Sequence, residues 1–294
     1  MPQNQASRTA LFVAVVRAVE SGKPEHLRIC NDPYAQRFVS RALFHLVRLL
    51  ERQGRTERIA PGVFGFMVAR ERHMDDYLTT CLSMGLEQLV ILGAGYDARA
   101  YRFTELAGRV RVFEADHPAS QEAKIEKLRG ILGHMPEHVV FVPIDLAKQD
   151  LATKLLSKGY NPRQRTLFIW QGVTQYLTPE VVDSALDFVV THSGEGSSVI
   201  FDYMYTSLLD GSAQRSEVAQ MRESRWFKQE PLTFGIPEGS VRSFLERRGF
   251  TEVHDADAAY LHKTYFRGAS ETRSVAHGYA IASAVVVPNP QKDT

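Results

Sequence analysis

The stretch LVILGAGYDARAYRF, residues 89–103, decides the fold of this 294-residue chain. It begins with an apolar run, continues with glycines at positions 93 and 95, and then carries an acid at position 97. An apolar strand followed by a glycine turn is typical of the first strand of a doubly wound α/β sheet, in which ligands bind where the strands end. We therefore ask which ligand this turn holds.

Short apolar segments continue after this stretch and alternate with helical ones. Because these segments are apolar almost throughout, we expect strands covered on both faces, as in a parallel sheet. The last two segments are joined by residues 258–277, which show no convincing helical period, so we expect those two strands to pair antiparallel. The sequence therefore predicts an α/β fold with a seven-stranded, mostly parallel sheet and an antiparallel terminal hairpin. The expected strands lie in QLVILGAG (88–95), RVRVFEAD (109–116), HVVFVPID (138–145), RTLFIWQG (165–172), SSVIFDYMY (197–205), FTEVHDAD (250–257) and YAIASAVVVP (279–288).

The first 85 residues predict an N-terminal helical cap, because their apolar residues recur at helical spacing. Asp32 and Pro33 are typical of a helix start. No linker or repeat divides the chain, so we expect a single domain. The expected cap helices cover 7–20, 33–52 and 63–84, with a polar loop over 53–61. The expected parts of the domain are the cap (1–85), the core (86–204), a helical excursion or lid (205–234) and the C-terminal part of the sheet (235–294).

Composition narrows the class of protein. The net charge of +1 gives no reason to expect a nucleic-acid partner, and the basic residues of the first sixty, Arg17 among them, are interpreted as solvated helix faces. Two cysteines make no disulfide framework, no apolar run is long enough to span a bilayer, and the N-terminus lacks the pattern of a signal peptide. We expect a cytoplasmic protein without a membrane partner, and without a metal because no metal-ligand spacing is present. The sequence leaves the oligomeric state open.

Two classes of cofactor fit the glycine turn. Gly93, Gly95 and Ala98 match the dinucleotide pattern G-x-G-x-x-G/A, with Asp116 placed to accept hydrogen bonds from a ribose. The same residues suit S-adenosylmethionine (SAM), whose ribose needs the same acid. The helical residues before the turn could fold over a methionine tail, and Asp145 ends the third strand, where an adenine would lie. These features favour SAM, while a nicotinamide (NAD) cofactor stays an alternative.

An ordered set of motifs makes a resemblance specific. The motifs are RTALFVAVVRA, NDPYAQRF, VARERHMDDYL, ILGAGYDARAYRF, FEADHPASQEAK, FVPIDL, FIWQGVTQYLTPE, VIFDYM and LTFGI. From Ser7 to Val287 the chain resembles the leucine carboxyl methyltransferase family, and most closely its bacterial branch of SAM-dependent O-methyltransferases, which includes polyketide O-methyltransferases. The resemblance implies the class I SAM-dependent methyltransferase fold, which is Rossmann-like and has the terminal antiparallel hairpin as a regular feature.

The resemblance also implies which residues bind the cofactor. The arginine of the motif VAR, Arg70, would hold the methionine carboxylate, which a guanidinium can bind bidentately, whereas Arg72 points to another face of its helix. Asp116 would accept hydrogen bonds from both ribose hydroxyls. The glycines would let the backbone approach the methionine part of the cofactor, and the Asp-Leu pair at 145–146 would bind the adenine. The expected cofactor-binding residues are Arg70, Gly93, Ala94, Gly95, Asp116, Asp145 and Leu146.

Gln171 departs from the family pattern, because related sequences usually have glutamate there. A carboxylate near the sulfonium of SAM would add favourable charge, and a neutral amide adds less. We expect either that the cofactor tolerates Gln171 or that this residue faces the substrate, and we expect Gln171→Glu to keep the fold. Tyr176 and Tyr203 follow the fourth and fifth strands and are, with Gln171, the candidates for lining the substrate pocket.

The resemblance implies an O-methyltransferase that acts on a small molecule, such as a secondary metabolite. We expect the acceptor to be a carboxylate, because a carboxylate is ionised at neutral pH and no histidine or lysine stands in an identifiable motif as a general base. Three alternatives stay open: a phenol or hydroxyl acceptor, an NAD-dependent oxidoreductase, and a SAM-binding protein without turnover, which Gln171 suggests.

Overall fold

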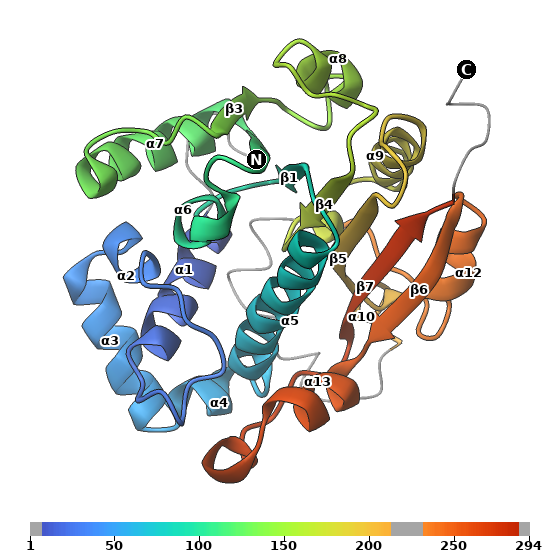
Figure 1. The fold of residues 1–294 in the computed structure, drawn as a ribbon. Coiled ribbons are helices and arrows are strands. Elements are labelled where there is room, and N and C mark those ends of the chain that lie inside the picture. The colour runs from blue at the N-terminus through green and yellow to red at the C-terminus, as the bar shows by residue number, and fades with distance from the viewer. Residues whose placement is uncertain (1–7, 213–231, 288–294) are drawn as a thin grey trace.

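The computed structural model describes residues 8–212 and 232–287 and consists of a seven-stranded sheet between two layers of helices (Figure 1). The strand order is β3-β2-β1-β4-β5-β7-β6. The first five strands are parallel, and β7 pairs antiparallel with both β5 and β6. The expected sheet with its antiparallel terminal hairpin is therefore confirmed. The strands are β1 (Gln88–Leu92), β2 (Arg111–Asp116), β3 (Val139–Pro143), β4 (Thr166–Trp170), β5 (Ser198–Met204), β6 (Phe250–Ala256) and β7 (Tyr279–Val286).

The N-terminal helices differ in two places from their predicted ranges. The expected helix over 33–52 is interrupted, because Val39 and Ser40 are extended and the Ser40 side chain begins a new helix by accepting a hydrogen bond from the Leu43 amide. The expected loop over 53–61 contains a short helix. Asp32 does lie at the start of this helical region, as predicted, because its carboxylate accepts a hydrogen bond from the amide of Tyr34. The helices are α1 (Arg8–Ser21), α2 (Ala35–Phe38), α3 (Arg41–Arg52), α4 (Arg55–Ile59) and α5 (Val63–Ser83).

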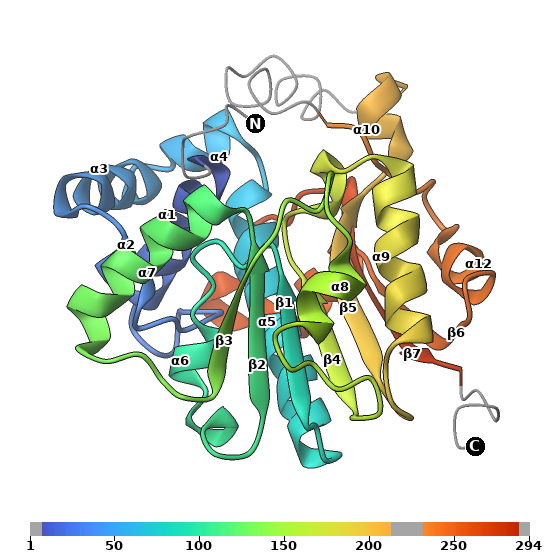
Figure 2. The same ribbon diagram turned by 90° about the horizontal axis from the view of Figure 1, so that it is seen from above.

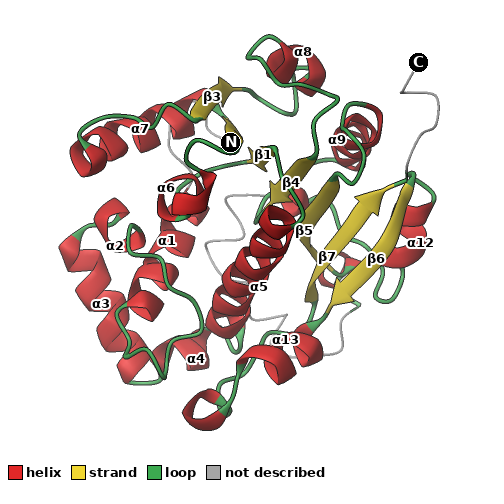
Figure 3. Cartoon of the chain, viewed as in Figure 1, coloured by secondary structure: helices red, strands yellow, loops and turns green. Residues whose placement is uncertain are grey.

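The connection between β6 and β7 contains a helix, α13 (Ala258–Tyr265), where the sequence predicted none. It packs against α5 instead of crossing the sheet, so the two strands still pair antiparallel (Figure 3). Of the expected lid, residues 213–231 lie outside the described chain. The other helices are α6 (Arg99–Arg102), α7 (Pro118–Leu132), α8 (Leu151–Leu156), α9 (Pro179–Thr191), α10 (Thr206–Asp210) and α12 (Val241–Glu246), with 3₁₀ turns η1 (Thr104–Leu106), η2 (Thr174–Tyr176) and η3 (Gly268–Ser270).

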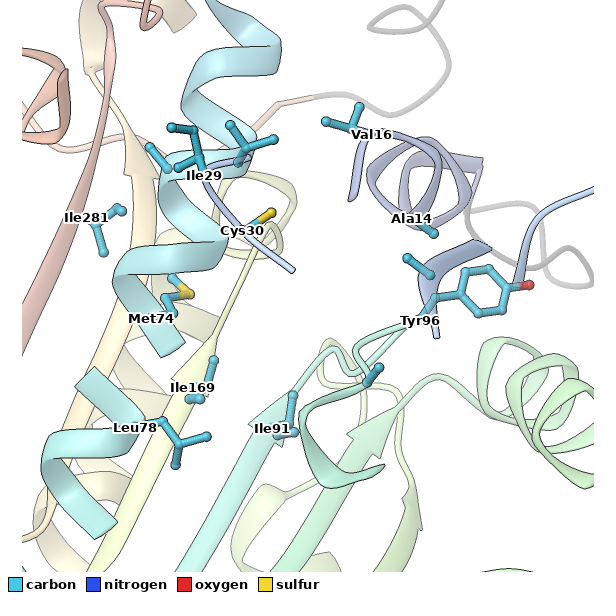
Figure 4. Close-up of a cluster of buried hydrophobic side chains, with 14 of the residues drawn as sticks. Ala14, Val16, Ile29, Cys30, Met74, Leu78, Ile91, Tyr96, Ile169 and Ile281 are labelled. Atoms are coloured by element: carbon cyan, nitrogen blue, oxygen red, sulfur yellow. The ribbon is translucent and has the colours of Figure 1, made fainter. Parts of the chain in front are cut away.

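Each face of the sheet carries its own apolar core, because successive side chains of a strand point to opposite faces. On one face Leu89 and Ile91 of β1 pack with residues of α1, α5, α6 and α7. On the other face Val90 and Leu92 pack with α8, α9 and α12 (Figure 2). In Figure 4, Met74 of α5 lies in the first core, close to the sheet. The layer of α1 and α5 therefore covers the sheet where the glycine turn begins. Within residues 8–212 and 232–287, no helix is both long and apolar enough to cross a membrane.

A hydrogen-bonded pair of rings joins α5 to α13. Nδ1 of His73 lies 2.9 Å from the hydroxyl of Tyr265, which donates to Asp76 at 3.0 Å. Because that hydroxyl proton is directed to Asp76, the Nδ1 of His73 is the donor to Tyr265. Burial, together with the neighbouring ring of His254, lowers the pKa of His73 to about 4. Folding therefore favours the neutral form of His73.

We expect the folded state to lose stability as the pH falls below the ordinary histidine pKa of about 6.5 towards 4, because the unfolded chain then binds a proton that the folded chain excludes. This contribution of His73 amounts to about 2 kcal/mol at pH 5. Urea unfolding at pH 7.5 and pH 5 measures it when the wild type is compared with His73→Gln. The stability difference between the two proteins should change by that amount between the two pH values, and a pH-independent difference would contradict the assignment.

Candidate functional site

A cavity of about 390 Å³ lies at the carboxyl ends of β1 to β4. Its size is within the usual range for small-molecule sites, roughly 300–1,000 Å³. Residues that follow directly after these four strands make most of its wall, and residues of α1, α5 and α7 and Thr233 add to it. The structure thus brings together residues that are far apart in the sequence. Those that were predicted for the site and line the cavity are Arg70, Gly93, Ala94, Gly95, Asp116, Asp145, Leu146, Gln171 and Tyr176.

Tyr203 was expected at the substrate pocket and lies elsewhere. Its ring is buried in the core on the opposite face of the sheet, and its hydroxyl donates to Asp255 of β6 at 2.9 Å. The neighbouring residue of β5, Asp202, points to the face that carries α5, where it meets Arg70. Because side chains alternate along a strand, only one of two successive residues can face the site. The expectation for Tyr203 is therefore corrected.

The protein atoms that pack against the glycine turn leave room only for glycine at positions 93 and 95. Gly93 and Gly95 have φ angles of 67° and 41°. A Cβ atom on Gly93 would lie 2.3 Å from Cγ2 of Val173, and one on Gly95 would lie 3.1 Å from Cβ of Ala10. The resemblance attributes these glycines to the approach of a cofactor. The backbone conformation and the packing of α1 and of the residues after β4 already account for them.

Asp116, at the end of β2, is held by the turn. One carboxylate oxygen accepts the Gly95 amide at 2.6 Å and the other accepts the His117 amide at 2.7 Å. A carboxylate offers about four acceptor positions, so each oxygen keeps one for a ligand in the cavity. Burial raises the pKa of Asp116, and the two amides oppose this by stabilising the charged form. The site therefore holds an acid whose remaining lone pairs suit a pair of hydroxyl groups.

Asp145 and Leu146 lie at the end of β3. The carboxylate of Asp145 accepts the Ala147 amide at 3.1 Å and pairs with Lys148 at 3.1 Å. Partial burial disfavours its charge, but these two contacts outweigh burial and lower the pKa of Asp145. Within the described residues no acceptor lies against the amide of Leu146. Asp145 thus shapes the turn, and the Leu146 amide remains a donor at the cavity wall.

Arg70 reaches the cavity from α5 and is only 4% exposed. Its Nη1 donates to Asp202 at 2.5 Å, and its guanidinium lies 5.8 Å from the ring centre of Phe66. The Nε and Nη2 atoms, which form one edge of the guanidinium, are buried and have no hydrogen-bond partner within the described chain. Leaving charged donors unpaired in a dry site is unfavourable, and a carboxylate would satisfy both through two parallel hydrogen bonds. Arg70 therefore fits the carboxylate of the expected cofactor.

Beneath the cavity lies a network of buried charges that the sequence did not reveal. At its centre is Glu71, which is 0% exposed and whose Oε1 lies 2.8 Å from Arg102, 3.3 Å from Arg99 and 3.5 Å from Arg17. Burial alone would raise the pKa of Glu71, but the three guanidinium groups lower it well below its ordinary value. Charges from α1, α5 and α6 are thereby joined below the site. The members of the network are Arg17, Asp32, Glu71, Asp75, Asp97, Arg99 and Arg102.

Arg17 corrects the interpretation of the N-terminal basic residues as solvated. It is 3% exposed, lines the cavity and donates to the backbone oxygen of Tyr96 at 2.5 Å. A signal for it was present in the sequence, since this arginine interrupts the apolar stretch AVVRAVE on a helix. Glu71 and Asp75 likewise stand four residues apart, which places two acids on one helix face.

Gln171 belongs to the same network, which explains why its side chain is neutral. Its Oε1 accepts from Arg99 at 2.8 Å and its Nε2 donates to Glu71 at 2.9 Å. The position requires an acceptor towards a cation and a donor towards an anion, and an amide provides both. A glutamate here would place a second carboxylate against Glu71. The structure therefore gives a reason to revise the expectation that Gln171→Glu is tolerated.

We expect Gln171→Glu to lower the free energy of unfolding by about 2–4 kcal/mol, because it sets a partly buried carboxylate against the fully buried one of Glu71. Combining it with Glu71→Gln restores one carboxylate and one amide, so the double variant should be more stable than the sum of the single changes by at least about 1 kcal/mol. Urea unfolding of the four proteins measures this coupling. Gln175→Glu, in the same turn, is the control for adding a charge. Strict additivity would show that Gln171 and Glu71 do not interact.

Residues 10–190 match the family described as "Leucine carboxyl methyltransferase". A protein of Mycolicibacterium vanbaalenii named "Putative S-adenosyl-L-methionine-dependent methyltransferase" is 34% identical over 260 residues, which cover 85% of this chain and 84% of that protein. A protein of the same description from Frankia alni is 35% identical over 213 residues, covering 72% and 74% of the two chains.

Solved structures share the fold at low sequence identity. The structure titled as a DUF574 family protein from Streptomyces avermitilis has a TM-score of 0.57 and 13% identity, with coverage of 96% of this chain and 98% of that one. A structure titled "putative methyltransferase" from Thermobifida fusca has a TM-score of 0.56 and 12% identity, with 94% of both chains covered. The sheet order and the terminal hairpin agree with the expected class I fold. In the described part of the chain, no group of three or more histidine, cysteine or acidic residues is arranged to hold a metal ion.

Proposed function

The chain belongs to the leucine carboxyl methyltransferase family and is a SAM-dependent methyltransferase, and we propose that it methylates an oxygen of a small molecule, specifically a carboxylate. The observation that carries the proposal is the cavity wall, to which both Arg70, whose Nε and Nη2 are unpaired in the described chain, and Asp116, which keeps free lone pairs, contribute. One group suits a carboxylate and the other suits a pair of hydroxyls. These are the two polar ends of an amino acid joined to a nucleoside.

The residues of the cavity divide the work of holding SAM. Arg70 would bind the methionine carboxylate with its Nε and Nη2 atoms, and Asp116 would accept the ribose hydroxyls. The Asp145 carboxylate and the Leu146 amide would meet the adenine. When bound, SAM supplies a methyl group already activated on a sulfonium. What remains for the protein is to hold the acceptor oxygen in line and to exclude water, which α1 supports by covering the cavity.

The wall on the side of α1 and η2 supports a carboxylate acceptor. It is formed by Thr9, Val13, Tyr176, Leu177 and Thr233. In this described wall no histidine, lysine or acid is placed to take a proton from a hydroxyl. A carboxylate acceptor needs no such group, because it is ionised above about pH 5.

The histidine and the lysine that line the cavity, the side chains that could take a proton from a hydroxyl, lie at its other end and are already engaged. His117 accepts the Ala119 amide with Nδ1 at 3.4 Å and caps α7, and Lys148 pairs with Asp145. Because both follow the strands that carry Asp116 and Asp145, they belong to the nucleoside end of the site. This leaves a phenol or hydroxyl acceptor without a base in the described wall.

An NAD-dependent oxidoreductase and a protein without turnover are both disfavoured by contacts within the chain. A dinucleotide cofactor was suggested only by the glycine pattern, which protein packing explains, whereas SAM is also supported by the family match. A protein without turnover was suggested by Gln171, and the contacts of this amide with Arg99 and Glu71 explain why it is neutral. Methyl transfer to an oxygen is the function that this geometry and the family support together.

We expect SAM and S-adenosylhomocysteine to bind in the micromolar range, roughly −7 to −9 kcal/mol. Asp116→Ala should weaken both by about 2–3 kcal/mol, because the ribose loses a charged acceptor. Isothermal titration calorimetry measures these affinities. Asp150→Ala is the control, since Asp150 is an exposed acid that accepts the Thr153 amide at 2.6 Å and caps α8 away from the cavity. Binding of NADH, with no binding of either SAM compound, would refute the proposal.

We expect the methylated product of the physiological acceptor to be an ester, formed at a rate nearly independent of pH from about 6 to 9, because a carboxylate acceptor stays ionised throughout. Mild alkali should then release methanol from the product. The prediction is tested by measuring the methanol released on alkaline treatment and the reaction rate as a function of pH. A base-stable product formed faster at high pH would identify a phenol or hydroxyl acceptor instead.

A further inference from the structure

Asp202, at the carboxyl end of β5, uses both carboxylate oxygens to hold different parts of the cavity wall. Its Oδ2 accepts from Nη1 of Arg70 at 2.5 Å, and its Oδ1 accepts the Gly172 amide at 2.5 Å. Asp202 is 2% exposed, so these contacts take place out of water. We propose that Asp202 is a positioning residue that aims Arg70 at the cofactor carboxylate and fixes the adjoining wall of the cavity. This inference rests on the proposed function.

Asp202 is well placed to set the direction of the Arg70 guanidinium. Asp202 forms an ion pair with Arg70, and the guanidinium also lies over the ring of Phe66. The ion pair engages Nη1 of Arg70. The edge made of Nε and Nη2 is then left without a hydrogen-bond partner in the described chain, on a residue that lines the cavity. A guanidinium binds a carboxylate bidentately only when its edge is presented at the correct angle, so the partner on Nη1 controls the binding geometry.

The second oxygen of Asp202 fixes the residues after β4. Gly172 has a φ of 69°, and a Cβ at this position would lie 3.4 Å from Nη1 of Arg70, so the turn passes close to the guanidinium. The backbone oxygen of Asp202 also accepts the hydroxyl of Thr174 at 2.7 Å. These hydrogen bonds tie the end of β5 to the segment that carries Val173 and Tyr176, both of which line the cavity. One residue thus links the carboxylate anchor to the acceptor wall.

An asparagine cannot take over both contacts. Its amide nitrogen would face either Nη1 of Arg70 or the Gly172 amide, and both are donors. Asp202→Asn also removes the negative charge beside Arg70. We therefore expect weaker binding of the amino-acid end of the cofactor, where Arg70 acts, and unchanged binding of the nucleoside end, where Asp116 lies.

The test compares two ligands that differ in this amino-acid end. S-Adenosylhomocysteine has the carboxylate, and 5′-methylthioadenosine has the same nucleoside without it. In Asp202→Asn we expect the affinity for S-adenosylhomocysteine to fall by about tenfold or more, and the affinity for 5′-methylthioadenosine to stay within about threefold of the wild type. Calorimetry on folded protein, checked by circular dichroism, measures both.

Asp255→Asn is the matched control. Asp255 lies on the neighbouring part of the sheet and accepts from Tyr203 on the face away from Arg70, so this variant loses a carboxylate contact without touching the cavity. Both ligands should bind it as they bind the wild type. A general effect of weakening the sheet would instead reduce both affinities in both variants.

An equal loss of both ligands in Asp202→Asn would overturn the positioning role, and so would wild-type affinity for both. Should Asp202→Asn fail to fold, Asp202→Glu replaces it, because it keeps the charge and displaces the carboxylate by one methylene. If Asp202→Glu loses affinity only for S-adenosylhomocysteine, the proposal is supported. If its affinity for both ligands is unchanged, the proposal is overturned. A wild-type protein that binds neither ligand would contradict the proposed function itself, which separates that failure from a failure of the role of Asp202.

Discussion

The buried carboxylate of Glu71 is the constraint on which the surroundings of the cavity depend. Burying a charge is unfavourable by several kcal/mol unless cations and hydrogen bonds replace the lost water. Glu71 meets this requirement with Arg17 from α1, with Arg99 and Arg102 from α6, and with the amide of Gln171 after β4. Satisfying one acid therefore brings together helices from three regions of the chain. Arg17, Asp97 and Gln171 of this network line the cavity, so stability and ligand binding depend on shared contacts.

Most of the sheet could be predicted because strands buried on both faces are short apolar segments, and the helical sequence between them indicates parallel pairing. The observed helices differ from the predicted ones where short-range contacts determine where a helix begins or whether it forms. The hydroxyl of Ser40 divides a helix that looks continuous in the apolar pattern. The helix α13 rests against α5 through one side only, with Ala258 and Leu261 buried, so eight residues carry too little periodicity to be recognised.

The site was predictable to the extent that adjacent parallel strands end at the same edge of a sheet, which brings Asp116 and Asp145 together without further information. The prediction for Tyr203 was wrong because one residue along a strand reverses the face of the sheet, and it is the neighbouring Asp202 that contacts the cavity residue Arg70. Gln171 could not be understood from the sequence, since its partner Glu71 is 100 residues away and spacing does not reveal such a pair. Charged residues that pair with each other inside the fold cannot be told apart, from the sequence, from charged residues that are free to bind a ligand.

The central claim is that the cavity binds an amino acid joined to a nucleoside, with Arg70 at one end and Asp116 at the other. A crystal structure of the protein with S-adenosylhomocysteine tests it most directly. The account predicts the ligand carboxylate against the Nε and Nη2 edge of Arg70 and the ribose hydroxyls against Asp116. A ligand whose carboxylate lies away from Arg70, or whose ribose contacts a different acid, would contradict it.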